Sequence, residues 1–353
     1  ELAKFHLLTY NVTFTLIQWN CDGFYPRLER LQQLIFDTAP TFICLQETNF
    51  TQSHNPQLKN YISYNFIRIA HLRASGGTSI FVSNDIYHQE LHINTNLETI
   101  AVAAWCPNKL TICNVYIPPN YYLTNSEIAD LIKQLPVPFL LVGDFNAHGA
   151  MWGSKLTFGR GKLIENLIND ANLNLLNTGS STYFHIQTGT FSSIDLSLCD
   201  PGIAPLLTWH TLDCLYDSNH FPIVISDNEP KEAVFLRKWK IAEADWDSFS
   251  LTVKEQINQT MFSNNINEAV SQFTDCIISS ANLHIGKFYV TSTKKSVPWW
   301  NESCKLAVRK CKTALNKYRR TRNDQDLINF KKLRAQSRRV LKTSKQESWN
   351  QYV

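Results

Sequence analysis

Eight short runs of apolar and β-branched residues lie in the first 228 residues of the 353-residue chain, and they constrain its fold more than any other feature. The runs are TLIQWN, TFICLQE, TSIFVS, TIAVAAW, LTICNVYI, FLLVGDFN, SIDLSLC and FPIVIS. Their length and their Val, Ile, Phe and Thr content predict strands. Leucine and isoleucine at helical spacing predict helices in RLERLQQLIFDT and GKLIENLINDANL. This pattern predicts an α/β fold in which sheets pack together and helices lie outside.

The composition changes near SDNEPKEAV, which predicts one domain over residues 1–228 and a second, helical segment over residues 229–353. The first part carries 11 basic and 18 acidic residues, a net charge of −7, whereas the second carries 23 basic and 12 acidic residues, a net charge of +11. Two basic amphipathic stretches near the end, separated by TRNDQD, predict a helical hairpin. A segment this basic favours a polyanionic partner, although a solvated basic face without a partner has the same composition.

The cysteines and the apolar runs indicate the cellular compartment in which we expect the protein. Nine cysteines without a CxxC pair are typical of buried, reduced thiols in an intracellular protein. The longest apolar run near a predicted strand, VPFLLVG, is far too short to span a bilayer, and no signal peptide is evident. We therefore expect a protein that has no membrane partner and is not secreted.

Polar residues stand where the predicted strands end. QWN ends in Asn20, LQE ends in Glu47, and VGDFN carries Asp144 and Asn146. A strand is buried up to its end, so a carboxylate there is paired, bound to a metal or in contact with water. One such residue is usually a solvated strand end, but four of them indicate a site. Carboxylate and amide oxygens without a set of Cys and His ligands favour Mg²⁺ or Mn²⁺ over Zn²⁺.

Two later residues extend this set, namely Asp195 in SSID and His220 in NHFP. An aspartate beside a histidine fixes its tautomer and raises its basicity, although Asp195 is equally open to a structural role as a buried acid. Metal-assisted hydrolysis of a phosphoester needs a positioned water, a base or charge partner, and stabilisation of the departing oxygen. This set of residues supplies all three. No nucleophile motif, P-loop or dinucleotide fingerprint competes with it.

Six motifs, QWN, LQET, NVYIPP, GDFNAH, GTFSSIDLSLC and NHFPI, follow one another in the order found in the exonuclease–endonuclease–phosphatase superfamily. Over about residues 16–226 the chain resembles the apurinic-type endonuclease domain of non-LTR (LINE-type) retrotransposons of the jockey/I kind. ADWDSF, PWWNESC and the basic helices resemble the connector to the reverse transcriptase. The resemblance implies a four-layered α/β sandwich, with two mixed sheets face to face and helices outside. It also implies a Mg²⁺-dependent (or Mn²⁺-dependent) endonuclease that nicks DNA to leave a 3′-hydroxyl primer.

The resemblance assigns the metal and the phosphate to several strand-end residues. Glu47 matches the principal Mg²⁺ ligand, and Asn20 matches a residue that supports the metal and the phosphate. Asp144 and Asn146 match the pair that aligns the attacking water with the scissile phosphate. Tyr116 matches a tyrosine that contacts the phosphate, although a core aromatic has the same sequence signature.

The remaining roles fall near the end of the predicted nuclease domain. Asp195 matches the acid that orients the catalytic histidine, and His220 matches that histidine. Ser192 lies where a small polar residue contacts DNA, although hydroxyls in turns are common. The partners implied are DNA, the element RNA and the reverse transcriptase of the same polyprotein. The implied place of action is the nucleus, after synthesis in the cytoplasm.

The chain departs from the family at Asn219, where the usual Ser-Asp-His motif has an aspartate beside the metal. An amide offers an oxygen ligand but no charge, so we expect weaker metal binding. Either the enzyme tolerates the asparagine or the chain is a decayed copy of a mobile element, and we favour an impaired but correctly folded nuclease. The basic tail has two interpretations, a spacer whose apolar stripe packs on an absent polymerase and an outer face that contacts nucleic acid.

Two rival functions stay open at this point. One is a phosphatase of the same superfamily that acts on small phosphoesters, and the other is a catalytically inactive DNA-binding module, to which Asn219 and the basic tail point.

Overall fold

The computed structural model describes residues 14–69, 74–227, 237–241, 244–259, 265–289 and 298–352. The chain divides into two compact units. The first comprises Glu1–Glu229 and Ser296–Val353, and the second comprises Pro230–Lys295. The predicted boundary after residue 228 falls outside the described residues, so the division into domains at that point stays a prediction.

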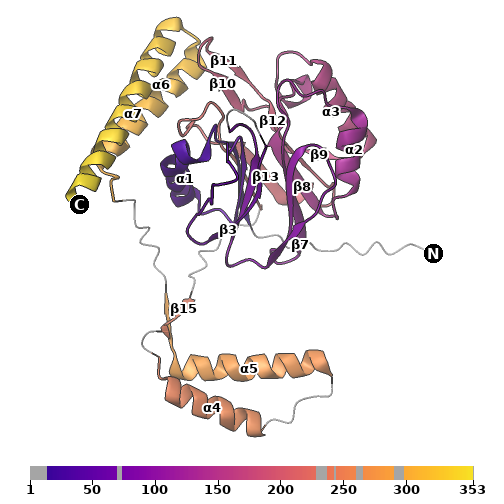
Figure 1. Ribbon diagram of the computed structural model, residues 1–353, viewed down its shortest axis with the longest axis vertical. Coiled ribbons are helices and arrows are strands. Elements are labelled where there is room, and N and C mark those ends of the chain that lie inside the picture. The colour runs from indigo at the N-terminus through magenta and orange to yellow at the C-terminus, as the bar shows by residue number, and fades with distance from the viewer. Residues whose placement is uncertain are drawn as a thin grey trace. The chain divides into compact units, whose positions relative to one another are not determined.

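Two six-stranded mixed sheets form the centre of the first unit (Figure 1). The first sheet has the order β13 (Leu207–Thr211), β14 (Ile223–Asp227), β1 (Thr15–Asn20), β2 (Phe42–Gln46), β4 (Thr78–Ser83) and β3 (Tyr61–Phe66). The second has the order β5 (His88–Leu91), β6 (Glu98–Trp105), β7 (Lys109–Tyr116), β8 (Phe139–Asp144), β12 (Asp195–Cys199) and β9 (Asn174–Leu175). Each sheet contains one parallel pair, β1–β2 in the first and β7–β8 in the second. All eight predicted strands are present.

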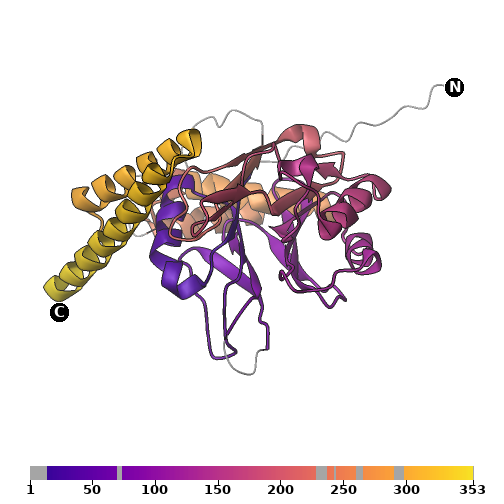
Figure 2. The ribbon, with the colours of Figure 1, turned by 90° about the horizontal axis from the view of Figure 1, so that it is seen from above.

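The central strands are apolar on both faces because each sheet is covered on both sides. In β1, Leu16 points into the core between the sheets, whereas its neighbour Ile17 packs under α1 (Phe24–Thr38). In β8, Val142 points into the same core, whereas Leu141 packs under α2 (Asn125–Lys133) and α3 (Gly159–Asp170). Figure 2 shows the sheets between the indigo α1 and the magenta α2 and α3. The predicted four-layered α/β sandwich is confirmed. Short 3₁₀ turns, η1 (Ala150–Trp152) and η2 (Ala204–Leu206), lie in the connections.

A buried polar network joins the two sheets near one end of their strands. The Gln18 amide donates to the Gly143 carbonyl (2.9 Å) and its oxygen accepts from the Ser197 hydroxyl (2.7 Å). The Gln46 amide donates to the side-chain oxygen of Asn114 (2.6 Å). A buried polar group costs free energy unless it is hydrogen-bonded, so these bonds fix how the sheets face each other.

Within the first unit, a helical hairpin of α6 (Glu302–Thr321) and α7 (Asp324–Tyr352) packs on the sandwich beside β10 (Tyr183–His185) and β11 (Thr190–Ser192), as Figure 1 shows. The predicted hairpin is therefore present. Its apolar stripe, which we expected to face an absent polymerase, instead packs on the α/β sandwich. The shared cluster comprises Phe184, Leu215, Phe221, Ala314, Leu315, Tyr318, Leu327 and Phe330.

The second unit is helical, as predicted for this part of the chain. It contains α4 (Trp246–Gln259) and α5 (Ile266–His284), together with a short antiparallel pair of β15 (Arg237–Trp239) and β16 (Lys287–Tyr289). Among the described residues, no helix is both long and apolar enough to cross a bilayer. The nine cysteines are all free thiols.

Candidate active site

The fold brings the predicted strand-end residues to one edge of the sandwich. The parallel pairs β1–β2 and β7–β8 both end here, so their carboxyl ends carry Asn20, Glu47, Tyr116 and Asp144 to a common place. Asp195, the first residue of β12, lies opposite Asp144 in the antiparallel register. Sequence-distant residues therefore meet because of strand order.

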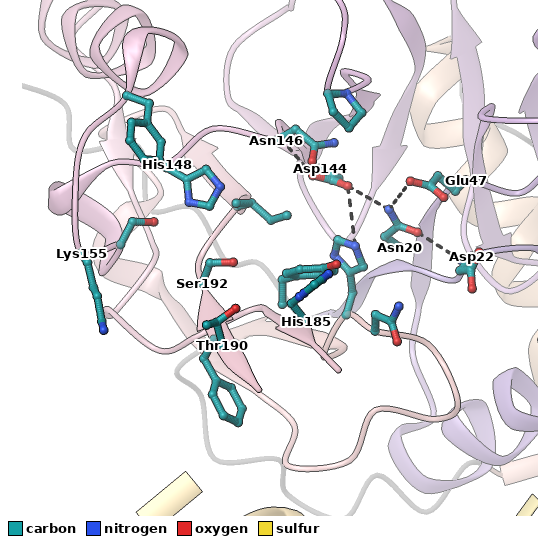
Figure 3. A pocket seen from close by; sticks show the side chains of 18 of the residues that line it. Asn20, Asp22, Glu47, Asp144, Asn146, His148, Lys155, His185, Thr190 and Ser192 are labelled. Carbon is teal, nitrogen blue, oxygen red and sulfur yellow. Dashed lines mark hydrogen bonds and ion pairs between the residues drawn. The ribbon is translucent and has the colours of Figure 1, made fainter. Parts of the chain in front are cut away.

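Asn20 connects the two carboxylates of this site (Figure 3). Its Nδ2 donates to Glu47 Oε1 (3.0 Å) and to Asp144 Oδ2 (2.8 Å). Glu47 Oε1 also accepts from the Tyr116 hydroxyl (2.8 Å). Burial and the neighbouring Glu47 raise the pKa of Tyr116 far above its ordinary range, so its hydroxyl remains a donor. Two carboxylates are thus held around one amide nitrogen.

Glu47 has an unusual backbone conformation. Its φ of +50° lies in the left-handed region, which costs a non-glycine residue free energy. Its carbonyl accepts from the Gly23 N–H (2.8 Å), which holds the turn after β2 in place. The side chain is half-buried and lines the cleft. Such local strain is typical of a residue that must present a side chain at a functional site.

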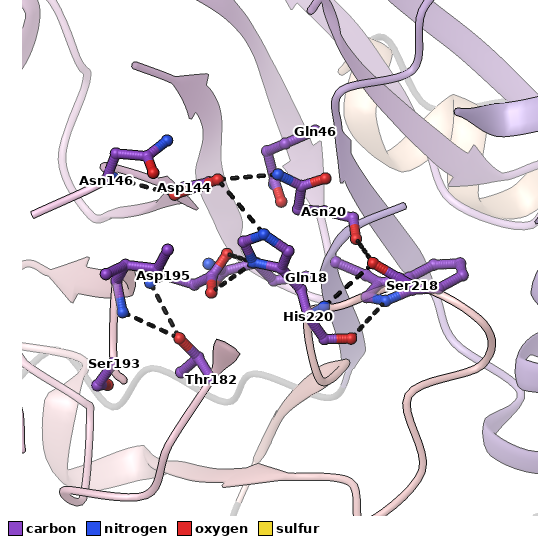
Figure 4. Close-up of polar contacts among 12 residues, drawn as sticks. Gln18, Asn20, Gln46, Asp144, Asn146, Thr182, Ser193, Asp195, Ser218 and His220 are labelled. Atoms are coloured by element: carbon purple, nitrogen blue, oxygen red, sulfur yellow. Dashed lines mark hydrogen bonds and ion pairs between the residues drawn. The ribbon is translucent and has the colours of Figure 1, made fainter. Parts of the chain in front are cut away.

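His220 and Asp195 form a buried pair beside Asp144 (Figure 4). The His220 Nδ1 lies 3.0 and 2.9 Å from the two Asp195 carboxylate oxygens, and its Nε2 lies 3.9 Å from Asp144 Oδ2. Burial alone would lower the pKa of His220, but the charge and hydrogen bond of Asp195, with Asp144 and Glu47 nearby, raise it to about 9. The imidazole is therefore charged at neutral pH.

Burial, together with the negative charge of Asp195, raises the pKa of Asp144 above the ordinary range of an aspartate. Its Oδ1 accepts from the Asn146 backbone N–H (2.9 Å). A raised pKa makes this carboxylate a stronger base near neutral pH, which suits proton transfer from water.

Several residues that the sequence did not single out hold the His220–Asp195 pair. The Thr182 hydroxyl accepts from the Ile194 and Asp195 N–H groups, both at 3.1 Å. The Ser218 hydroxyl donates to the Asn20 carbonyl (2.7 Å) and accepts from the His220 N–H (3.1 Å). The ring of Tyr183 lies against the imidazole, with centroids 4.7 Å apart. Thr182 and Ser218 lie in loops and Tyr183 begins the three-residue strand β10, so none of them gives a periodic signal in the sequence and all three were missed.

An open cleft of about 710 Å³ leads to this cluster. Asn20, Glu47 and Asp144 lie at one end, with Asn146 beside them (Figure 3), and His220, which also lines the cleft, lies next to Asp144. The opposite wall, visible in Figure 3, carries Ser192, Thr190, His148 and Lys155. Ser192 thus lies in the same cleft as the predicted catalytic residues. The cationic Lys155 and the histidines His148 and His185 were not predicted, although GDFNAH contains the first of these histidines.

Asn219 also lines the cleft, but its side chain has a cationic neighbour. Its Oδ1 lies 3.5 Å from Arg334 Nη2 of α7. The same guanidinium donates to the carbonyls of Asp217 (3.2 Å) and Ser218 (2.9 Å). The Asn219 oxygen, predicted to be a metal ligand, therefore faces a positive charge in this structure.

The donor set fits a divalent cation that prefers oxygen. Ligand atoms of Asp144, Asp195 and His220 lie within 4.8 Å of one another. The imidazole is already bonded to Asp195, however, so this pair is internally neutralised. The remaining negative charge belongs to Glu47 and Asp144, held together by Asn20. Two neighbouring carboxylates suit Mg²⁺ or Mn²⁺, whereas the Asn20 oxygen is bonded to a backbone N–H (3.1 Å).

The chain is similar, in sequence and in fold, to endonuclease domains. The sequence model of a family described as endonuclease-reverse transcriptase matches residues 110–224. The chain is 25% identical over 218 residues to the probable RNA-directed DNA polymerase from transposon X-element of Drosophila melanogaster, covering 60% of this chain and 24% of that protein. It is 25% identical over 224 residues to the RNA-directed DNA polymerase from mobile element jockey of the same species, covering 58% and 23%.

Solved structures show the same fold. The endonuclease domain of TRAS1, a telomere-specific non-LTR retrotransposon, matches with a TM-score of 0.51 and 20% identity, covering 62% of this chain and all of that domain. The AP endonuclease LMAP of Leishmania major matches with a TM-score of 0.50 and 13% identity, covering 62% and 89%. The chain spans about a quarter of the length of the curated relatives it matches. The predicted resemblance to non-LTR retrotransposon endonuclease domains is confirmed.

Proposed function

We propose that the chain is a Mg²⁺-dependent DNA endonuclease that nicks one strand and leaves a 3′-hydroxyl, which primes reverse transcription by the polymerase of the same element. The observation that carries this proposal is the convergence of Asn20, Glu47, Asp144 and the His220–Asp195 pair at one end of an open cleft. Element RNA and the reverse transcriptase are the further partners proposed. The proposed place of action is the nucleus.

Each residue has a separate role in hydrolysis. Asp144 takes a proton from the attacking water, and its raised pKa suits that step. The water oxygen bonds to phosphorus as the bond from phosphorus to the 3′ oxygen breaks, and the departing 3′ oxygen takes a proton from solvent water to become the 3′-hydroxyl. The protonated His220, oriented by Asp195, donates to a phosphate oxygen on which charge accumulates.

Glu47 and Asp144 are the residues that would hold the divalent ion, with the carboxamide of Asn20 between them. When bound, such an ion supplies positive charge for the scissile phosphate and the departing oxygen. Tyr116 fixes the Glu47 carboxylate through its hydroxyl, and Asn146 and Ser192 face the cleft, where they contact the DNA.

The test is nicking of supercoiled plasmid in Mg²⁺, in Mn²⁺ and in EDTA. We expect open circular product only with a divalent ion, and ends that a DNA polymerase extends. Glu47→Ala should lower the rate by about 100-fold or more, since removal of a group that stabilises the transition state costs about 3 kcal/mol. Glu90→Ala, which changes an exposed glutamate on β5, is the matched control. Equal rates for both variants, or faster turnover of a small phosphoester than of DNA, would contradict the proposal.

A further inference from the structure

Near the turn that joins them, α6 and α7 are both bonded to the connection between β10 and β11, the pair of strands that lines the cleft. The Tyr318 hydroxyl donates to the Gly189 carbonyl (2.8 Å), and Lys331 Nζ donates to the Gln187 carbonyl (3.3 Å). Gly189 has a φ of +72°, and a side chain there would collide with the Tyr318 hydroxyl. Its glycine therefore allows both the β turn and the close approach of α6.

Arginines at this end of the helical hairpin reach the wall of the cleft. The Arg322 guanidinium lies 4.2 Å from the ring centroid of Phe191, a residue that lines the cleft. The Arg319 guanidinium lies 4.0 Å from the ring centroid of Phe221, which follows His220 in the chain. Arg320 is exposed. A guanidinium stacked on a ring keeps its N–H edge free for a phosphate.

Positive charges outnumber negative charges near this turn. Lys312 pairs with Asp213 and Lys317 pairs with Asp326, both at 2.7 Å. Within the described part of the chain, no carboxylate lies within 4.0 Å of the charged groups of Arg319, Arg320 and Arg322. Asp324, an exposed acid in the first turn of α7, offsets one of these charges. The turn therefore presents a net positive surface that adjoins the cleft.

We propose that this basic turn, Arg319, Arg320 and Arg322 with Lys331, binds the phosphate backbone of duplex DNA that flanks the site of cleavage. The inference rests on the proposed function, because it takes the strand in the cleft to be DNA. The helical hairpin lies outside the residues matched by the endonuclease-reverse transcriptase family model, so it adds a binding surface to the nuclease. Its packing on the sandwich places the arginines at a constant distance from the catalytic residues.

The test compares two double substitutions on the same helix. Arg320→Gln/Arg322→Gln removes two charges at the turn. Arg309→Gln/Lys310→Gln removes two exposed charges about 16 Å nearer the start of α6, at about 1.5 Å per residue. Binding of a labelled DNA duplex is measured in EDTA between 50 and 200 mM salt. We expect the turn variant to raise Kd about tenfold at the lower salt. The slope of log K against log salt should fall by about 1.8, at about 0.9 per phosphate contact. The control should change Kd less than about twofold.

Nicking kinetics in Mg²⁺ give the second measurement. The turn variant should raise KM and leave kcat unchanged, since the arginines lie away from the reacting atoms. The inference would be overturned if both double variants lost the same DNA affinity or if the turn variant kept the wild-type Kd. It would also be overturned if the turn variant lost affinity only for an RNA duplex probe. If the turn variant binds DNA more weakly than the wild type and the control, but the wild type does not nick DNA, the proposed function alone would be overturned.

Discussion

At the scale of single residues, the site combines a charged imidazole with two carboxylates that share one amide donor. Asn20 holds Glu47 and Asp144 by the same nitrogen, and Asp195 holds the ring of His220. The sequence predicted which residues would meet, because strand ends and motif order reveal them. It did not predict Thr182, Ser218 or Tyr183, which reach the site from loops and from the start of β10 and support the pair only through tertiary contacts.

Asn219→Asp tests the departure from the family at the residue scale. An aspartate adds negative charge to the cleft, but Arg334 lies 3.5 Å from the Asn219 oxygen and neutralises part of it. We therefore expect the Mg²⁺ concentration for half-maximal nicking to fall by about threefold, since a partly solvated charge interaction contributes about 0.5–1 kcal/mol. A Mg²⁺ titration of plasmid nicking at constant ionic strength measures this change. An unchanged Mg²⁺ requirement with full activity in both proteins would show that the amide causes no impairment.

At the scale of elements, the helical hairpin is part of the first compact unit. Its apolar stripe was evident from helical spacing, but a stripe does not say which surface covers it. The hairpin packs on the sandwich through side chains far apart in the sequence, such as Phe184 and Phe330, whose ring centroids lie 5.7 Å apart. The strands were predicted well because covered strands are continuously apolar, whereas β3, half-buried along most of its length, gave no comparable run.

Arg334→Met tests whether α7 positions the loop that carries His220. Arg334 is buried, and burial with the nearby Arg338 lowers its pKa to about 10, so it is charged at neutral pH. Its loss leaves the Ser218 carbonyl without this donor, which costs about 1–3 kcal/mol when the carbonyl stays buried, whereas the Asp217 carbonyl still accepts from Arg338 (2.9 Å). We expect kcat for nicking to fall about tenfold, equivalent to about 1.4 kcal/mol, with little change in KM.

The control for this prediction is Arg339→Met, which changes an exposed arginine on the same helix. It should leave kcat unchanged, and Arg334→Lys should restore part of the loss because a lysine still donates to one carbonyl. Thermal unfolding of each variant separates a shifted loop from an unfolded protein. The same kcat in Arg334→Met and Arg339→Met would mean that α7 does not position the histidine.

At the scale of the whole molecule, the site stands at the meeting point of both sheets and the hairpin, so its ionisation is coupled to folding. The four-layered sandwich was predictable from the motif order, and so was the charge difference between the two parts of the chain. The packing of the final helices was not, because it depends on side chains such as Arg334 that touch only backbone carbonyls and one amide oxygen. Such contacts leave no pattern in a single sequence.

The pH dependence of the free energy of unfolding follows from this coupling. The folded protein raises the pKa of His220 from 6.5 to about 9. The folded state therefore holds a proton that the unfolded state loses, and the stabilisation is complete below pH 6.5 and disappears as the pH rises to 9. In EDTA we expect the free energy of unfolding to decrease by up to about 1.4 kcal/mol per pH unit across this range. The raised pKa of Asp144 adds a slope of the same sign.

Urea unfolding at pH 6, 7, 8 and 9 measures this slope in the wild type, in His220→Gln and in His92→Gln. His220→Gln should make the curve less steep between pH 7 and 9, because glutamine carries no proton to release. His92 is exposed, so His92→Gln should keep the wild-type slope. A wild-type stability that rises between pH 7 and 9, or a His220→Gln curve as steep as the wild type, would contradict a charged imidazole held by Asp195. The imidazolium that donates to the phosphate in the proposed mechanism would then be excluded as well.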